Sequence, residues 1–247
     1  MRLFNLLSLV SEVLFNSTFP GIGTMRSVSL IFFISISLSQ WTTFKLAELS
    51  DFSKDSPALY RKAGFASTHS YPLKITGENR ISLGGSMLKG FSSNGLLPIL
   101  QGKVKVSWNL YLRGRMAAYT AKEGAVQMYG WGLSLRPGKE DKPSKWVINF
   151  DSGRLNSHDE LKVSAIQASA IREIGWNKFP IHLGFGMNIL KANQYSFLGN
   201  DYPGKTEIQT NFINFGTAVS LSGLEVIPQI WLGSEYAMVS VNIVGKF

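Results

Sequence analysis

The stretch Tyr236-Ala-Met-Val-Ser-Val-Asn-Ile-Val-Gly-Lys-Phe247 decides the fold, because its side chains alternate strictly in character. Counting back in twos from Phe247, one face is almost wholly apolar, with Gly245, Ile243, Val241, Val239 and Ala237. The other face leans polar, with Lys246, Val244, Asn242, Ser240 and Met238. Successive side chains of a β-strand point to opposite sides. The pattern therefore predicts a strand that separates an apolar environment from a more polar one.

The same alternation recurs upstream. From Lys103 to Arg113, an apolar face (Val104, Val106, Trp108, Leu110, Leu112) opposes Lys103, Lys105, Ser107, Asn109, Tyr111 and Arg113. The stretch 181–189 repeats it, with His182, Gly184, Gly186 and Asn188 on the polar side. The sequence predicts strands at 103–115, 123–136, 144–151, 160–172, 179–190, 206–221, 224–232 and 235–247, with two weaker ones at 59–69 and 79–90. The segments 136–144, 151–160 and 191–205 are predicted to be loops.

These strands suit a membrane barrel better than a sandwich. They run about 9 to 13 residues, as a tilted transmembrane strand needs, whereas strands of globular proteins most often have about 5 or 6. Glycine pairs such as Gly184 and Gly186 suit a crowded interior better than a solvated surface. We predict an all-β protein, an antiparallel up-and-down transmembrane β-barrel of about 8–10 strands. A soluble exported β-sandwich or a lipocalin-like binding protein stays open as the alternative.

The amino-terminal part of the chain has the pattern of an export signal. Met25-Arg26 begins a short basic region, and the apolar run 28–38 is too short to span a bilayer, which takes about 20 residues. Small residues at 37 and 39 place the cut before Gln40. We therefore expect residues 1–39 to be an extension plus signal peptide starting at Met25, residues 40–57 a periplasmic lead-in, and residues 58–247 the barrel.

Taken together, the export signal, the amphipathic strands and the aromatic Phe247 at the end of the last strand resemble the outer-membrane β-barrel proteins of Gram-negative bacteria. The resemblance lies in architecture and includes no diagnostic motif. It implies a Sec-type route to the outer membrane and contact with outer-membrane lipid. It also implies that Phe247 is part of the signal that the barrel assembly machinery reads. It does not imply a particular activity or oligomeric state.

Composition excludes several kinds of site. The chain of 247 residues has no cysteine, which excludes thiolate metal sites, disulfides and a cysteine nucleophile. The formal net charge of +9 comes from Lys and Arg residues that are dispersed, so we do not expect a nucleic-acid partner. Phosphate-loop and dinucleotide patterns are also absent, and we expect no cofactor, no metal site and no catalytic site.

Four cations share the polar face of the predicted strand 103–115, namely Lys103, Lys105, Arg113 and Arg115. Facing a lumen, they could favour a small anionic solute, since charged rings set the selectivity of pores. They could instead pair with lumen acids and fill a closed barrel, whose interior at eight strands is just wide enough for side chains. His182 and Asn188 are predicted to be polar residues of the same lumen.

Three histidines are the residues that would support an enzyme: His69, His158 and His182. His69 precedes Ser70, but neighbours on a strand point to opposite faces, which is poor geometry for a nucleophile and its base. The sequence therefore favours a non-enzymatic barrel with a structural, binding or minor porin-like transport role. An outer-membrane barrel hydrolase stays open as a second alternative.

Overall fold

The computed structural model describes residues 41–42, 44, 52–72, 75, 79–90, 95–121, 124–158, 161–176, 179–195, 204–221 and 223–247. The predicted extension and signal peptide within 1–39 lie outside this range. Within it, the helical part is neither long nor apolar enough to cross a membrane.

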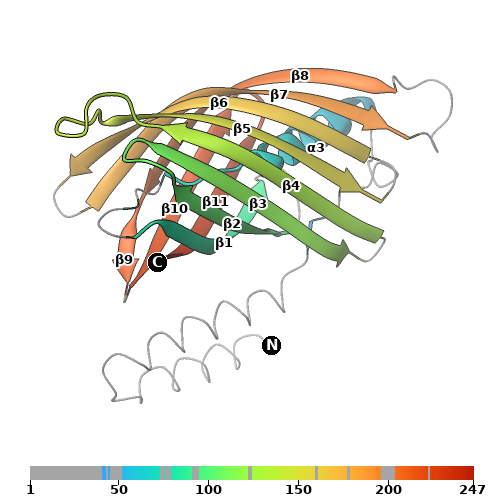
Figure 1. Ribbon diagram of the computed structural model, residues 1–247. Helices are drawn as coiled ribbons and strands as arrows, with labels where there is room; N and C mark the ends of the chain where they lie inside the picture. Colours follow the sequence, from blue (N-terminus) through green and yellow to red (C-terminus); the bar gives the residue numbers. More distant parts are fainter. Residues whose placement is uncertain are drawn as a thin grey trace, which may run out of the picture. The chain divides into compact units, whose positions relative to one another are not determined.

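In the described part of the chain, helix α3 (Phe52–Ser67) precedes all the strands (Figure 1). The strands are β1 (Ile81–Gly90), β2 (Leu97–Lys105), β3 (Leu110–Ala121), β4 (Gly124–Leu135), β5 (Trp146–Ser157), β6 (Leu161–Trp176), β7 (Phe179–Gln194), β8 (Lys205–Thr217), β9 (Val219–Leu221), β10 (Leu224–Gly233) and β11 (Ala237–Lys246).

The strands form one closed antiparallel sheet. Each strand from β1 to β7 pairs with the next along the chain, and β11 pairs with both β10 and β1, which closes the barrel. Strands β8 and β9 both pair with β10 and act as one wall strand broken at Ala218, so the barrel wall has ten strand positions. Pro228 of β10 lies opposite this break and has no N–H to donate across it. The prediction of an antiparallel barrel of 8–10 strands is confirmed.

Two strand predictions were wrong, and their errors cancel in the count. The weak strand at 59–69 is part of α3. The predicted strand 103–115 is a hairpin in which β2 ends at Lys105 and β3 begins at Leu110. The side chain of Ser107 helps to form the turn between them, since its Oγ donates to Asn109 Oδ1 at 2.7 Å and accepts from the Leu110 amide at 3.2 Å.

The predicted polar loop 151–160 is also corrected. Strand β5 continues through it to Ser157, and the side chains of Asp151, Gly153, Leu155 and Ser157 point inward in regular alternation. His158 follows in the left-handed region with φ 54°. Asp151 is therefore a wall residue of the barrel interior.

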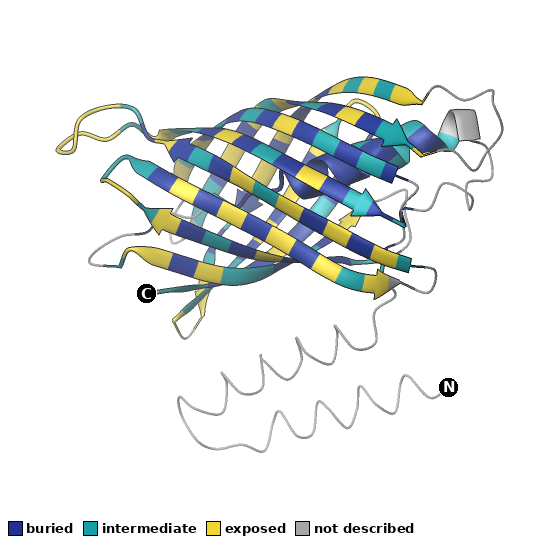
Figure 2. Cartoon of the chain, turned by 45° about the vertical axis from the view of Figure 1, so that its right-hand side comes forward, coloured by how far each residue is buried: buried dark blue, intermediate teal, exposed yellow. Residues whose placement is uncertain are grey.

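The two faces of the wall differ in chemistry, and Figure 2 shows the alternation of buried and exposed residues along each strand. On the outward face, a band of exposed apolar side chains runs around the barrel. It includes Leu83, Leu100, Leu112, Trp131, Phe150, Ile166, Phe185, Ile213, Phe215 and Val241. Buried inward residues are largely polar and include Ser86, Gln101, Arg113, Asp151, Gln167, Asn188, Asn214, Gln229 and Asn242. A sheet that closes on itself is not a sandwich, so the sandwich alternative is wrong. A soluble lipocalin-like barrel would expose polar side chains to water and bury apolar ones, which is the reverse of the arrangement seen here.

The barrel has two distinct ends. We call the end where β1 begins and β11 stops the terminal end, and the end where Leu96 and Glu235 lie the distal end. Toward the distal end the outward face becomes polar, with exposed Gln127, Arg154, Lys191, Glu207 and Gln209. The apolar band therefore covers the terminal part of the wall, and β4, β5, β7 and β8 continue beyond it.

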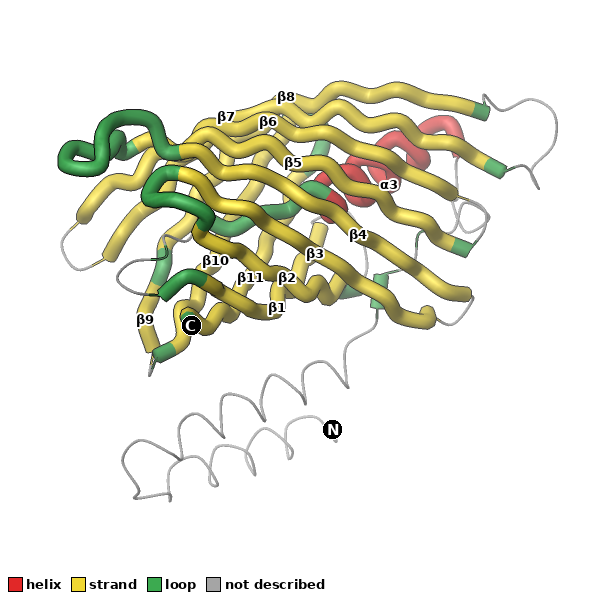
Figure 3. Tube along the Cα trace, in the orientation of Figure 1, coloured by secondary structure: helices red, strands yellow, loops and turns green. Residues whose placement is uncertain are grey.

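Helix α3 lies inside the barrel, behind the wall formed by β4 to β7 in Figures 1 and 3. It packs against β4, β5, β6, β7 and β8. This corrects the predicted boundary of the barrel domain at 58: the wall begins at Ile81, and the chain before it fills the interior. The helix has buried side chains on more than one side, including Tyr60, Lys62, Ala63, Phe65 and Ala66.

Candidate functional site: the filled lumen

Helix α3 is held at the distal half of the lumen by aromatic packing. The ring of Phe65 packs edge-on against Phe212, with centroids 5.2 Å apart, and stacks on Tyr236 at 5.6 Å. Trp231 is 6.3 Å from the same ring. Full burial of one such side chain stabilises the folded state by roughly 1.5–3 kcal/mol. Phe65 therefore anchors the helix to the β8–β10–β11 wall.

Polar contacts fix the outer turn of the helix to the distal rim. The Tyr60 hydroxyl is hydrogen-bonded to the side-chain amide of Gln194, at the end of β7. The Arg61 guanidinium pairs with Glu235, in the turn before β11. The buried Lys62 ammonium lies 5.6 Å from the ring centroid of Phe44. Since these partners come from separate parts of the rim, the helix is tied on more than one side.

Glycines make room for the helix in the wall. A Cβ on Gly153 would lie 2.0 Å from the carbonyl oxygen of Ser67, and one on Gly130 would lie 2.5 Å from the same atom. On the helix itself, a Cβ on Gly64 would meet Leu190 Cδ2 at 2.7 Å. The carboxyl end of α3 therefore touches the backbone of β4 and β5 directly. Only glycine permits this approach.

The chain crosses the barrel from end to end. At the distal end, Trp41 forms a parallel bridge with Leu96, and the Thr42 amide donates to Leu96 O at 3.0 Å. Beyond α3, the Tyr71 hydroxyl is 3.1 Å from Ser82 Oγ, near the start of β1. The chain then enters the wall at the terminal end. The expected periplasmic lead-in at 40–57 thus includes residues at the distal rim and the first turn of the lumen helix.

The predicted lumen cations meet an acid on β5. Strand register places Arg113 opposite Gly132, and Gly132 opposite Asp151. Because Gly132 has no side chain, the guanidinium of Arg113 crosses β4 and donates to Asp151 Oδ2 at 2.8 Å. The second carboxylate oxygen of Asp151 is paired with Arg115. All three charged groups are almost completely buried.

Arg115 also connects the wall to the lumen segment. Its Nη1 donates to the carbonyl oxygen of His69 at 2.7 Å, and its Nη2 donates to Trp131 O at 3.2 Å. Lys103 is buried beside Arg113, on the neighbouring strand β2. Lys105 lies at the end of β2 and is only partly buried. Three of the four cations therefore occupy the closed interior, and two of them share one aspartate.

A second polar network surrounds the segment after the helix. His69 Nε2 is 3.0 Å from Asn242 Oδ1, which also accepts from Ser86 Oγ at 2.6 Å. Gln101 Nε2 donates to Ser86 Oγ at 2.9 Å. From β7, Asn188 Nδ2 donates to Thr68 Oγ1 at 2.8 Å. Residues 68 and 69 are thus hydrogen-bonded to two different strands of the wall, β7 and β11.

The three histidines are not brought together. His69 lies at mid-lumen in contact with β11, His158 follows the distal end of β5, and His182 is near the terminal end of β7. Ser70 is buried, and its Oγ has no partner among the described residues. Among those residues there is also no group of His, Asp and Glu side chains that could hold a metal ion.

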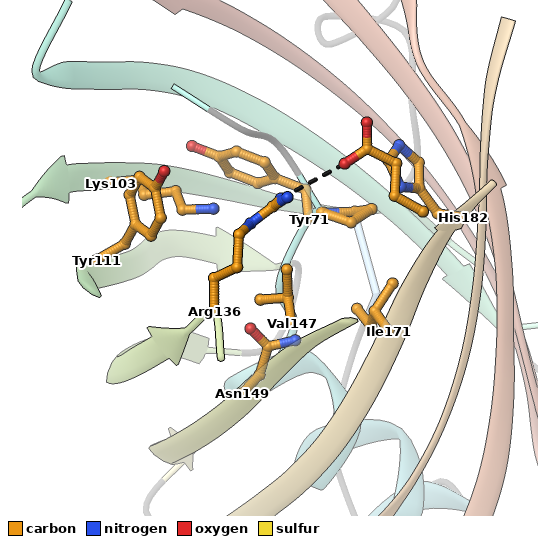
Figure 4. A pocket seen from close by; sticks show the side chains of 10 residues that line it. Tyr71, Lys103, Tyr111, Arg136, Val147, Asn149, Ile171 and His182 are labelled. Atoms are coloured by element: carbon orange, nitrogen blue, oxygen red, sulfur yellow. Dashed lines mark hydrogen bonds and ion pairs between the residues drawn. The ribbon is translucent and has the colours of Figure 1, made fainter. Parts of the chain in front are cut away.

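At the terminal end, a small cavity of about 30 Å³ lies between the lumen segment and the wall. Figure 4 shows Lys103 and Arg136 reaching toward it, with Tyr71 and Tyr111 beside them. His182 lines the cavity and is only 5% exposed. Arg136 pairs with Glu173 at 3.4 Å. Phe247, at the same end of the barrel, is exposed, and its amide donates to Ile81 O at 2.8 Å.

Sequence reasoning missed the acid that organises this lumen. The predicted strand 144–151 ends at Asp151 and the predicted loop 151–160 begins there, although the alternation of 146, 148 and 150 continues with inward residues at 151, 153, 155 and 157. Asn242 lies on the polar face of the final strand but was not singled out as a site residue. For Ser86 and Gln101, only a regular inward position on β1 and β2 could have pointed to the network.

No protein-family model matches the sequence, and no curated protein matches it. Among solved structures, the chain is similar to the N-terminal β-barrel domain of Pseudomonas aeruginosa OprF, with 12% identity, a TM-score of 0.36, and coverage of 70% of this chain and 100% of that one. It is similar to the translocator domain of the autotransporter NalP from Neisseria meningitidis, with 11% identity, a TM-score of 0.37, and coverage of 78% and 94%. For the attachment invasion locus protein Ail of Yersinia pestis the identity is 12%, the TM-score 0.25, and the coverage 70% and 99%.

These scores are too low to support an argument about activity. The class of the protein follows instead from its own geometry: a closed ten-stranded antiparallel β-barrel, apolar on the outward face of its band, and filled by a polar network and its own helix.

Proposed function

We propose that this chain is a small integral protein of a Gram-negative outer membrane with a structural or binding role, and that it does not conduct solutes through a wide pore. The observation that carries the proposal is the inverted surface. Phe185 is 57% exposed and Trp131 60% exposed on the outward face, whereas Asp151 is 2% exposed inside. Water would not favour this arrangement, but a bilayer would.

A filled lumen argues against a porin-like role. Helix α3 packs against five strands of the distal half, and Arg113, Arg115 and Asp151 pair across the interior of the terminal half. At the terminal end, the cavity of about 30 Å³ between the described lumen residues and the wall is much smaller than a solute channel requires. The hydrogen bonds of Thr68 with Asn188 and of His69 with Asn242 bind the lumen segment to the wall, so solute passage would require these contacts to break.

The polar continuation of the wall suggests an orientation. Exposed outward residues on the distal parts of β4, β5 and β7 include Gln127, Arg154 and Lys191, so these strands extend beyond the lipid layer there. Outer-membrane barrels have short periplasmic turns and longer extracellular structure. We infer that the distal end faces the outside, which would place Trp41 at the cell surface and both ends of the wall at the periplasmic side.

Fractionation tests the location. We expect the protein in the outer-membrane fraction, migrating faster on a gel without boiling than after boiling, because a closed barrel resists unfolding in detergent. A soluble periplasmic pool that folds in plain buffer would contradict the proposal. Single-channel recording separates the roles: we expect little conductance from the wild type, and large regular conductance steps would contradict the closed lumen.

A further inference from the structure

The outward face of the wall is hollowed by a groove of about 900 Å³ that crosses β5, β6, β7, β8 and β10. Its lining is largely apolar and includes two alanines of β6, Ala168 and Ala170. Strand register places Ala170 between Ile148 and Phe185, and Ala168 beside Met187. Since small side chains lie between larger ones there, the surface is depressed along β6.

The groove runs obliquely from one end of the wall towards the other. Register continues the row of Ile148, Ala170 and Phe185 to Ile213 and then to Leu232. Ile148 lies near the start of β5 at the terminal end, whereas Leu232 lies near the end of β10 at the distal end. Four strand spacings give the row a length of about 19 Å. This is close to the roughly 15 Å that the hydrocarbon chains of one bilayer leaflet occupy.

A cation lies at the terminal end of the groove. Arg172 follows Ala170 on the outward face of β6 and is exposed. Its register neighbours Trp146 and Leu183 are apolar and exposed, as is Ile174 at the next outward position of β6. An arginine that faces lipid costs more the deeper it lies, so one in these surroundings favours an anionic partner.

Trp146 holds the guanidinium at the mouth of the groove. Arg172 Cζ lies 5.8 Å from the centroid of the indole ring. The same ring packs edge-on against Phe185, with centroids 6.0 Å apart. Trp146 begins β5 directly after the exposed Lys145, and aromatic residues form girdles at membrane interfaces. In a bilayer, Arg172 would then lie at headgroup level, and the groove would begin about 7 Å deeper, one outward position along the strand.

We propose that Arg172 and this groove form a binding site for one phospholipid whose headgroup has a net negative charge. The phosphate pairs with the guanidinium of Arg172, whose fork of donors matches phosphate oxygens. One acyl chain lies over Ala170 and Ala168 and follows the groove towards Leu232. A zwitterionic headgroup is disfavoured because it brings a second cation close to Arg172. The proposal rests on the membrane location proposed above and adds one specifically bound lipid to it.

Other occupants fit the groove less well. In a two-fold dimer the same patch of both subunits meets, so a second copy of the barrel would bring two Arg172 side chains into one apolar interface. Burying such charges without a partner is costly. A free phosphate ion would leave the apolar groove unfilled. A phospholipid supplies both the counter-charge and the apolar chain.

Native mass spectrometry of the full-length barrel, released from detergent micelles, tests the site. Phosphatidylglycerol or phosphatidylcholine with the same acyl chains is titrated into the micelles. We expect the wild type to retain one phosphatidylglycerol, with an apparent affinity at least tenfold above that for phosphatidylcholine. Arg172→Gln should abolish this preference, because the anion loses its partner. Arg154→Gln, at an exposed outward position near the distal end of β5, is the matched control and should behave as wild type.

The apolar part of the site has its own variant. Ala170→Phe fills the groove and should weaken the retention of both lipids at least fivefold, whereas Ala118→Phe, at an exposed outward position of β3, should not. If Ala170→Phe does not fold, Arg172→Lys takes its place, since it keeps the charge and should keep part of the preference.

Three results would overturn the proposal: equal retention of phosphatidylglycerol by the wild type and Arg172→Gln, a barrel dimer in place of a bound lipid, and displacement of the lipid by inorganic phosphate. Migration on a gel without boiling is recorded for every variant. A folded barrel that retains no phosphatidylglycerol overturns this site alone. A chain that folds in plain buffer overturns the membrane location itself.

Discussion

The backbone amide of Arg80 donates a hydrogen bond to the carbonyl oxygen of Phe247 at 2.8 Å. This bond places the start of the wall beside its end. An antiparallel barrel with an even number of wall strands begins and ends at the same end of the barrel. Trp41 lies beside Leu96 at the opposite end of the barrel. Since α3 joins the two regions through the interior, the chain is threaded through its own lumen. The predictions below test the outward face, the lumen charges and this threading.

Arginine on the outward face should separate a membrane barrel from a soluble one. Phe185→Arg replaces an exposed side chain within the apolar band, and we expect it to destabilise the barrel in lipid by about 2–4 kcal/mol. Gln127→Arg lies on the same outward face but beyond the band, and it should cost much less. Urea unfolding in lipid vesicles measures both. An equal and small effect of the two substitutions would mean that Phe185 faces water.

Replacing Asp151 should destabilise the barrel, because two buried arginines share its charge. In Asp151→Asn, Arg113 and Arg115 lose their shared counter-charge in a nearly water-free interior. Leaving buried charges uncompensated typically costs about 3–5 kcal/mol. Urea unfolding in detergent should show a loss of this order. Asp141→Asn, in an exposed loop, removes the same charge and should leave stability unchanged. A similar loss of stability in both variants would mean that net charge causes it, and not the pairing of Asp151 with the two arginines.

One added methyl group should disturb the lumen helix. In Gly153→Ala the new Cβ would lie 2.0 Å from Ser67 O, so the end of α3 must shift. We expect a destabilisation of about 1–3 kcal/mol from overpacking, with faster proteolysis of the lumen segment. Gly114→Ala is the control, because its Cβ would meet nothing within 4 Å. Unchanged stability and protease resistance of Gly153→Ala would show that the helix does not rest on this wall.

The sequence predicted the faces of the wall better than its turns. Lys103 and Arg113 point inward as predicted from one continuous alternation, although a turn separates them. The turn at 106–109 contains an even number of residues, so the alternation keeps its phase across it. Periodicity alone therefore cannot detect this turn, and only Ser107 and Asn109 indicate it.

The helix in the lumen was harder to predict for a physical reason. An amphipathic period arises when one face of a helix meets water. Helix α3 is instead surrounded by the wall, and even Lys62 on it is buried. The approach of Ser67 to Gly130 and Gly153 depends on residues far apart in sequence, as does the sharing of Asp151 by Arg113 and Arg115. Such contacts follow from strand register, which one sequence does not reveal.

Cysteine labelling tests the threading most directly, because the natural chain has no cysteine that would add background. Three single substitutions are compared: Trp41→Cys before the helix, Tyr195→Cys at the distal rim and Lys139→Cys at the terminal end. A polymer-linked maleimide too large to cross the outer membrane is applied to intact cells. We predict that Trp41→Cys and Tyr195→Cys react on intact cells, whereas Lys139→Cys reacts only after lysis. Labelling of Trp41→Cys together with Lys139→Cys, on the side opposite Tyr195→Cys, would contradict a chain threaded through its own barrel.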